Sequence, residues 1–473
     1  MNRLLCTLAL AALGLVAVGR AGDAPQAKPQ AQPATPKAKP ATPITRLFFQ
    51  DLASCSLKWA DVTVGPNKAL VLGPIAGVNG FKKLDPAKQK LVQMREFGSL
   101  LCVGVRDNED GAFESGWVLV QTGVGYADHG DHGHWYYKKT PEVVDSRLDT
   151  QQGNPAHMYL YDGRFFIAND RLNGYTRIDP SKYATNEARK LGKGEPRFLV
   201  GGGNHITLAV VDDKVGYSAW IDGDGPNKGR VDVTPVTTNP KSEPAYSFSL
   251  PSGGIHGAIA NSGKVFFAPA DGVDWVEADL ALSQKAEQVK VHHIDLGKEG
   301  EKPRRTGAFV NHQHYVLLVT GRQAPQLVLL NAKQAEPKPV FVPLAVQKGT
   351  QAITPEVVTT VDGKAYAFIF HDRLKGAEAT DALEIVALDP NGDGDCSDAK
   401  SLKVLPVGPS AVEGHFGHHA IAFDADRRYG FFTNPGDGTI SVISLGTLEI
   451  IATFNVGGTP TEILARGGED VED

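Results

Sequence analysis

Residues 201–225, GGGNHITLAVVDDKVGYSAWIDGDG, contain the unit that decides the fold of this 473-residue chain. An apolar run follows His205, and a polar turn comes at Asp212-Asp213-Lys214. A second apolar run, Val215–Trp220, then leads into the acidic loop that begins at Asp222. Two short runs of this kind, joined by a tight polar turn, predict a β-hairpin.

The same unit recurs from about residue 150 onward, at a spacing of about 50 residues. At the point that His205 occupies, the other units have His157, His256 and the pair His418-His419, and one unit has Glu356. Second strands are expected at Phe165–Ala168, Val215–Trp220, Val265–Ala268, Ala365–Phe370 and Tyr429–Thr433. Repeats of four short antiparallel strands predict an all-β fold, a β-propeller of seven or eight four-stranded blades.

The two ends of this repeat region resemble parts of one further blade. Arg46–Val64 resembles third and fourth strands, and Pro460–Leu464 resembles a lone first strand. Pairing them would close the ring and leave no exposed sheet edge at the seam. One segment departs from the β pattern: Asp85-Pro86 opens an amphipathic run, which predicts a helix over residues 85–97.

We expect four regions along the chain: a secretory signal peptide at 1–21, a Pro/Ala/Lys-rich linker at 22–44, the propeller at 45–466 and an acidic tail at 467–473. The signal places the protein in the periplasm or outside the cell, with no membrane insertion after cleavage. Without Arg3 and Arg20 the net charge changes from −6 to about −8, which argues against nucleic-acid binding. One disulfide could form among Cys55, Cys102 and Cys396, and the pairing is left open.

Propeller geometry gives the repeated histidines a common location. The first strand of each blade is the innermost, so residues at its start face one mouth of the central channel. We therefore expect His157, His205, His256, Glu356 and one of His418 and His419 to converge there. Loops after the second strands bring further polar side chains to that mouth: Asp170, Asp222, Asp271 and His371. Imidazole and carboxylate donors suit Zn²⁺, Ni²⁺ or Cu²⁺.

Two other segments have metal-binding character. The stretch Ala127–His134 alternates His129, Asp131, His132 and His134 with glycines, which favours a loop that captures a metal and passes it on. It connects a third to a fourth strand, so simple topology places it on the face opposite the inner histidines. A second loop offers oxygen ligands for calcium at Asp389, Asn391, Asp393 and Asp395, although its composition favours a tight polar hairpin over a calcium site.

These features resemble the periplasmic zinc metallochaperones that serve zinc ABC importers, a family of β-propellers. The resemblance rests on Asp128–His134, on the blades that contain His157, His205 and His256, and on the last blade, His418–Gly458. It covers about residues 95–466. It implies zinc capture in the periplasm, direct transfer to the importer's solute-binding protein, and a His-rich loop close to the bound metal.

We therefore predict a periplasmic zinc-binding chaperone, a monomer, with Zn²⁺ at the channel mouth and Ca²⁺ as a second candidate ion at 389–395. Two alternatives stay open. A metal-dependent propeller enzyme, either a zinc hydrolase or a copper oxidoreductase, would need a base beside the metal, and Glu356 is the inner carboxylate available. A non-catalytic interaction scaffold would need no metal at all.

Overall fold

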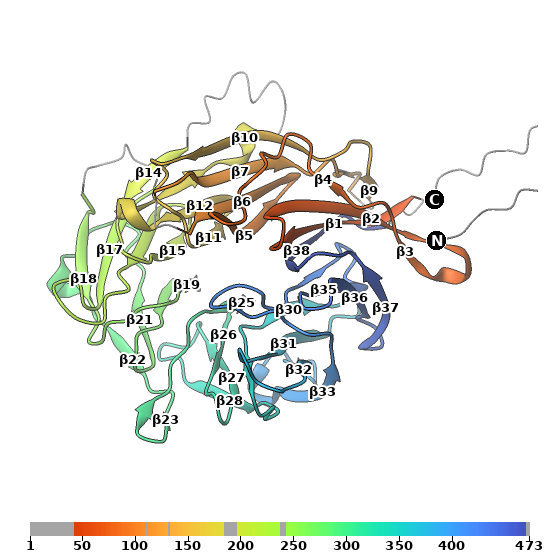
Figure 1. Cartoon of the computed structure of the whole chain (residues 1–473). Coiled ribbons are helices and arrows are strands. Elements are labelled where there is room, and N and C mark those ends of the chain that lie inside the picture. Colours follow the sequence, from red (N-terminus) through yellow and green to blue (C-terminus); the bar gives the residue numbers. More distant parts are fainter. Residues whose placement is uncertain (1–41, 109–111, 131–132, 184–195, 237–242, 470–473) are drawn as a thin grey trace, which may run out of the picture. The chain divides into compact units, whose positions relative to one another are not determined.

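The computed structural model describes residues 42–108, 112–130, 133–183, 196–236 and 243–469. The described part is all-β, and its strands form eight blades arranged in a ring (Figure 1). The predicted fold class is confirmed, with eight as the number of blades. Within the described ranges, no helical segment has the length and apolar character that a bilayer crossing demands.

Each blade is a four-stranded antiparallel sheet that follows the chain from the centre outward. Blade 1 contains β5 (Gln89–Phe97), β6 (Leu100–Asp107), β7 (Ser115–Gln121) and β10 (Glu142–Asp149); blade 2 contains β11 (Met158–Tyr161), β12 (Arg164–Asn169), β13 (Gly174–Ile178) and β14 (Arg197–Val200). Blade 3 contains β15 (Thr207–Val211), β16 (Val215–Ala219), β17 (Arg230–Pro235) and β18 (Tyr246–Ser249); blade 4 contains β19 (Ala258–Asn261), β20 (Lys264–Phe267), β21 (Val273–Glu277) and β22 (His292–Ile294).

The second half of the ring repeats this order. Blade 5 contains β25 (Val310–His312), β26 (Tyr315–Thr320), β27 (Gln326–Asn331) and β28 (Pro339–Pro343). Blade 6 contains β30 (Glu356–Thr359), β31 (Ala365–Arg373), β32 (Ala382–Ala387) and β33 (Lys400–Pro406), and β29 (Thr350–Ala352) also pairs with β31. Blade 7 contains β34 (Ile421–Phe423), β35 (Tyr429–Asn434), β36 (Thr439–Ser444) and β37 (Glu449–Asn455). Two small hairpins, β8–β9 (Gly125–Asp128, Gly133–Tyr136) and β23–β24 (Lys298–Glu299, Lys302–Pro303), project from this framework.

The burial of the strands explains why the middle ones are apolar runs and the outer ones alternate. Second strands such as β31 are buried along almost their whole length, because neighbouring blades cover both of their faces. Outer strands such as β37 alternate between exposed and half-buried positions. Burial on both faces favours continuous apolar runs, whereas burial on one face favours alternation.

The polar turns between first and second strands are tight hairpins that need unusual backbone angles. Asp162 and Gly163 have φ values of 48° and 70°, and Ser262 and Gly263 have 48° and 76°. Two consecutive positive φ values are the signature of a type I′ turn, which favours Asp, Asn and Gly. This explains the Gly/Asp signals that mark the repeat in the sequence.

Blade 8 closes the ring with strands from both ends of the chain. β38 (Pro460–Arg466) is its innermost strand, followed by β1 (Pro43–Asp51), β2 (Ser56–Val64) and β3 (Leu70–Leu72), while the short β4 (Ala76–Gly77) also pairs with β2. β1 and β38 pair antiparallel, with Phe48 opposite Leu464. The predicted closure by the two ends is confirmed. The order differs, because β1 and β2 are the second and third strands and not the third and fourth.

The predicted helix over residues 85–97 is wrong, since Gln89–Phe97 forms the strand β5. Leu91 and Met94 are both buried, and this three-residue spacing imitates a helical face. The pairing with β6 shifts register between these two residues, which marks a β-bulge. The extra residue of the bulge keeps both side chains on the core face of a strand.

Candidate metal centre

Three histidines from three consecutive blades meet at one mouth of the ring. His157 lies one residue before the first strand β11, and His205 and His256 lie two residues before β15 and β19. The Nε2 atoms of His157 and His205 lie 2.8 Å apart. The ring centroids are 4.5 Å apart for His157 and His205, 5.0 Å for His205 and His256, and 6.1 Å for His157 and His256. The repeat therefore brings together the three residues that the sequence placed at one point of it.

A fourth imidazole, which the sequence did not predict as part of this group, completes the cluster. The His415 ring lies 5.9 Å from the ring of His256 and 6.3 Å from that of His205, stacked against both. His415 belongs to the connection between blades 6 and 7, six positions before β34, and reaches the cluster from across the ring. Its place in a connection, away from the repeated strand start, is why the repeat pattern missed it.

Two of the four imidazoles have oxygen partners on Nδ1. The Nδ1 atom of His256 lies 3.1 Å from the Gly307 carbonyl oxygen, and that of His205 lies 3.5 Å from Asp170 Oδ2. Asp170 is buried, and it accepts hydrogen bonds from Arg106 (3.1 Å) and from the Ile206 amide (3.0 Å). Partners of this kind hold the proton on Nδ1 and leave Nε2 free for a metal. Asp170 therefore lies where it can orient the His205 ring.

Burial favours the neutral imidazole at three of the four positions, His157, His256 and His415. Burial lowers the pKa of His157 well below its ordinary range, and the neighbouring rings of His205, His256 and His415 lower it further. Burial also lowers the pKa values of His256 and His415, with contributions from the nearby histidines. A neutral imidazole has a free lone pair, which is the form that binds a metal ion.

The donor types suit zinc, but the rings would have to rearrange to bind it, because no three ligand nitrogens of this cluster lie within 4.8 Å of one another in the described structure. Four imidazole nitrogens satisfy a tetrahedral Zn²⁺ ion with Zn–N bonds of about 2.0–2.1 Å, which separates the nitrogens by about 3.3 Å. His157 and His205 are at hydrogen-bonding distance, 2.8 Å, so their nitrogens would move apart by about 0.5 Å to admit the ion. The rings of His256 and His415 would in turn have to rotate toward this pair, since their centroids are 5.0–6.3 Å from those of their neighbours.

His418 and His419, predicted as metal residues, are held elsewhere by one buried carboxylate. Asp372 lies 2.7 Å from Nδ1 of His418 and 2.6 Å from Nδ1 of His419. These contacts lower the pKa of Asp372, although burial acts in the opposite direction. His419 is buried, with Nε2 2.9 Å from the Gly408 carbonyl oxygen. Neither histidine is part of the four-histidine cluster.

Asp372, Asp381 and His419 are the described residues that bring three ligand atoms within 4.8 Å of one another. The ligand atoms of these three side chains already form hydrogen bonds within the protein. Asp381 accepts from the amide and hydroxyl of Ser410, at 2.9 and 3.0 Å, and from the Arg373 amide. Both nitrogens of His419 also have partners. We therefore interpret this group as a buried hydrogen-bond network that anchors the connection before blade 7.

Glu356 begins β30 in blade 6, at the inner position that the repeat predicted. Burial raises its pKa to about 7, partly offset by Arg95, and Glu462 of β38 raises it further. Its charged neighbours are thus on blades 1 and 8. Glu356 is the carboxylate that a zinc hydrolase would need as its base. In the described structure its charged neighbours are Arg95 and Glu462, and not the four imidazoles.

The His-rich hairpin β8–β9 lies at the other end of the inner strands. Arg466, the last residue of β38, stacks over Trp135 at 5.0 Å, and the Tyr137 hydroxyl donates to the Gly468 carbonyl at 2.9 Å. The four histidines precede the beginnings of inner strands, and a seven-residue strand such as β38 spans about 23 Å. The rings of His129 and His134 are 5.3 Å apart, while Asp131 and His132 lie outside the described residues. These contacts put the described part of the hairpin at the end of β38, as simple topology predicts, and no described residue of it contacts the four histidines, which the resemblance placed beside it.

The remaining predicted ligands have local roles. Asp222 accepts a hydrogen bond from Asn204 (2.7 Å), Asp271 accepts one from Ser252 (2.5 Å), and His371 is buried against Glu384 (2.8 Å).

In the loop at 389–395, both oxygens of Asp389 accept from backbone amides of Gly392, Asp393 and Gly394. Asn391, Asp393 and Asp395 are exposed in this self-bonded hairpin. Cys55, Cys102 and Cys396 are buried and unpaired.

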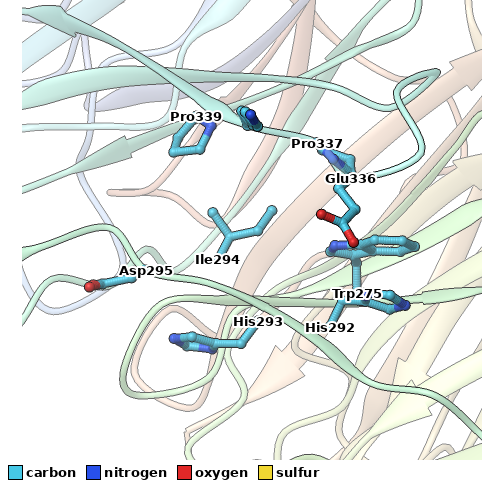
Figure 2. A pocket seen from close by; sticks show the side chains of 9 residues that line it. Trp275, His292, His293, Ile294, Asp295, Glu336, Pro337 and Pro339 are labelled. Carbon is cyan, nitrogen blue, oxygen red and sulfur yellow. The ribbon is translucent and has the colours of Figure 1, made fainter.

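His292 and His293 line a separate cavity of about 360 Å³ between blades 4 and 5. Figure 2 shows His292 beside Trp275, whose ring it stacks on at 3.9 Å, and Glu336 facing them from the neighbouring blade. His293 is held by the buried Asp274 at 2.7 Å. These two histidines lie on an outer strand and are independent of the cluster at the mouth.

No family model and no curated protein matches the chain. Solved structures resemble it in fold. Two structures of AztD from Citrobacter koseri, one of them the apo form, are 14% identical to it and align over 91% of this chain and 100% of theirs, with TM-scores of 0.59 and 0.60. Dihydro-heme d1 dehydrogenase NirN in complex with DHE is 14% identical over 91% of this chain and 77% of its own, with a TM-score of 0.51. At this level of identity the likeness establishes the β-propeller fold.

Proposed function

We propose that this protein is a periplasmic zinc chaperone that binds one Zn²⁺ ion through His157, His205, His256 and His415. The observation that carries the proposal is the convergence of four imidazoles from four separate connections of the ring, with neighbouring rings 4.5–6.3 Å apart. Chance rarely gathers four metal-capable side chains, and burial lowers the pKa values of three of them, His157, His256 and His415, which favours the neutral form. The sequence resemblance to zinc metallochaperones supports zinc over nickel or copper.

The proposed partner is the solute-binding protein of a zinc ABC importer, which receives the ion directly. Four neutral donors bind zinc without adding negative charge, and Asp170 is the carboxylate that supports them. An acceptor that offers a more anionic site would therefore draw the ion away. The same donor set disfavours hydrolysis, since a four-coordinate site has no open position for water.

We assign the β8–β9 hairpin a separate part in this function. His129, Asp131, His132 and His134 would collect metal weakly at the opposite face, independently of the four-histidine site. The contacts of this hairpin with Arg466 and Gly468, at the end of β38, support a role apart from the main site.

Elemental analysis of protein purified without a histidine tag tests the proposal. We expect one tightly bound zinc per chain, no hydrolysis of ester or phosphoester substrates, and zinc transfer to the importer's binding protein faster than through free solution. Protein that binds no zinc at micromolar concentration would refute the metal site and favour the interaction scaffold. Hydrolytic turnover that depends on zinc would instead favour the enzyme.

A further inference from the structure

His415 differs from the other three histidines in what holds it. It lies in the short hairpin Ala411–Gly417, which is closed by backbone hydrogen bonds between its two ends (2.9 Å) and between Glu413 and Phe416 (2.9 and 3.1 Å). Gly414 and Gly417 have φ values of 63° and 79°, which the reversal of the chain requires. The hairpin tip, including His415, is exposed.

The other three histidines are fixed to the framework of the blades. The carbonyl of His157 accepts from the Ala168 amide of β12 (2.9 Å), and the His256 amide donates to the carbonyl of Ala268 (3.0 Å). Asp170 holds both the His205 ring and the amide of the next residue. Within the described residues, by contrast, the His415 ring has stacking contacts with His205 and His256 and no side-chain hydrogen bond.

Two weak contacts fasten the hairpin across the mouth. The ring of Phe416 lies under the Lys90 ammonium of blade 1, at 4.5 Å, and Glu413 pairs with Lys375 of blade 6 at 3.2 Å. Both members of the second pair are exposed, and exposed ion pairs contribute little. The flanks of the hairpin are anchored by Ser410 and His419, so the Lys90–Phe416 contact is the stronger of the two contacts that hold its tip, and a contact of this kind breaks readily.

We propose that His415 is the exchangeable zinc ligand and that the hairpin Ala411–Gly417 is the release gate, an inference that rests on the proposed zinc site. When the hairpin lifts, the zinc ion keeps three fixed imidazoles and loses one. A ligand atom of the zinc-receiving protein then takes the vacant position. The ion remains four-coordinate, and the exchange involves no oxidation or reduction. The acceptor would approach this mouth of the ring and not the face that bears the β8–β9 hairpin.

Zinc dissociation from the full-length protein into excess chromogenic chelator tests the gate. Phe416→Ala leaves all four ligands in place and should release zinc about two- to fivefold faster, the effect of losing one exposed cation–π contact. Phe416→Trp should restore the slow rate. His415→Ala should retain one zinc per chain and release it at least about tenfold faster. The matched control is Tyr136→Ala, which removes a cation–π contact of the same 4.5 Å length, to Lys138, at the opposite face and should not change the rate.

The outcomes separate the gate from the site itself. If the unaltered protein binds no zinc, the proposed function fails. If it binds one zinc, but Phe416→Ala and His415→Ala release the ion at its rate, the gate is refuted while the site stands. Equal acceleration by Tyr136→Ala would also refute the gate, because a general loosening of the ring would then explain the result.

Discussion

Replacing Asp170 with asparagine should weaken zinc binding without removing any ligand. The carboxylate accepts from Arg106 and the Ile206 amide, and it faces Nδ1 of His205. Asparagine keeps one oxygen for the amide of Ile206 but presents an NH₂ group to the other two partners. His205 would then favour a proton on Nε2, the nitrogen that faces the other rings, and this proton must be removed before zinc can bind.

The size of the effect follows from these contacts. Loss of a carboxylate that supports a metal-bound histidine typically reduces affinity about 10- to 100-fold, or about 1.4–2.7 kcal/mol. The contact from Asp170 to His205 is long, at 3.5 Å, so we expect a value near the lower end. Asp222→Asn is the matched control, because Asp222 occupies the corresponding loop of the next blade and bonds to Asn204 instead.

Competition with a chelator of known affinity at pH 7.5 measures the change, and circular dichroism confirms that both variants are folded. We expect about tenfold weaker binding for Asp170→Asn and unchanged binding for Asp222→Asn. Equal affinities for Asp170→Asn and the unaltered protein would show that the Arg106–Asp170–His205 chain has no part in the site.

Further predictions concern the site, its pH dependence and the closure of the ring. His205→Ala combined with His256→Ala should abolish stoichiometric zinc in elemental analysis, whereas deleting residues 129–134 should retain it; zinc left in the double variant would contradict the site. Zinc at one hundred times its Kd should stabilise the fold by about 2.7 kcal/mol in thermal unfolding, and chelation should remove the gain. Because burial lowers the pKa of His157 below its ordinary value of 6.5, the unfolded chain binds this proton more readily. Apo-protein stability should therefore fall as the pH drops below 6.5, with a shallower fall in His157→Gln; identical urea midpoints for both at pH 8 and 5.5 would argue against it. Truncation before Pro460 removes the innermost strand of blade 8, so cooperative unfolding should be lost, and a sharp transition in the truncated chain would count against closure by β38.

The propeller was predictable because each blade repeats a local pattern. Apolar runs, tight Asp/Gly turns and a fixed point for His157, His205 and His256 all depend on the residues nearby. The bulge in β5 was not predictable, since one extra residue in a strand puts Leu91 and Met94 on one face at the three-residue spacing of a helical turn. Pairing with β6 distinguishes them, and that pairing is a tertiary property.

The site was predicted in part for the same reason. Three ligands follow from the repeat, but His415 comes from a connection whose path across the mouth is set by contacts with Lys90 and Lys375 on other blades. His418 and His419 occupy the repeated point in sequence, yet Asp372 turns both imidazoles toward itself. The spacing of residues in the sequence does not reveal that a buried carboxylate such as Asp372 will bind these histidines.

The pairing of β1 with β38 also determines when this protein can finish folding. Thr45 and Arg466, bonded to each other in blade 8, are 421 positions apart. At a synthesis rate of about 5–20 residues per second, β38 is synthesised about 20 to 80 seconds after β1. Throughout that interval Phe48 and Phe49 lie on an unpaired edge, which is a template for aggregation. A holding factor that shields the nascent amino-terminal strands should therefore raise the yield of active protein more than one that acts after the chain is complete.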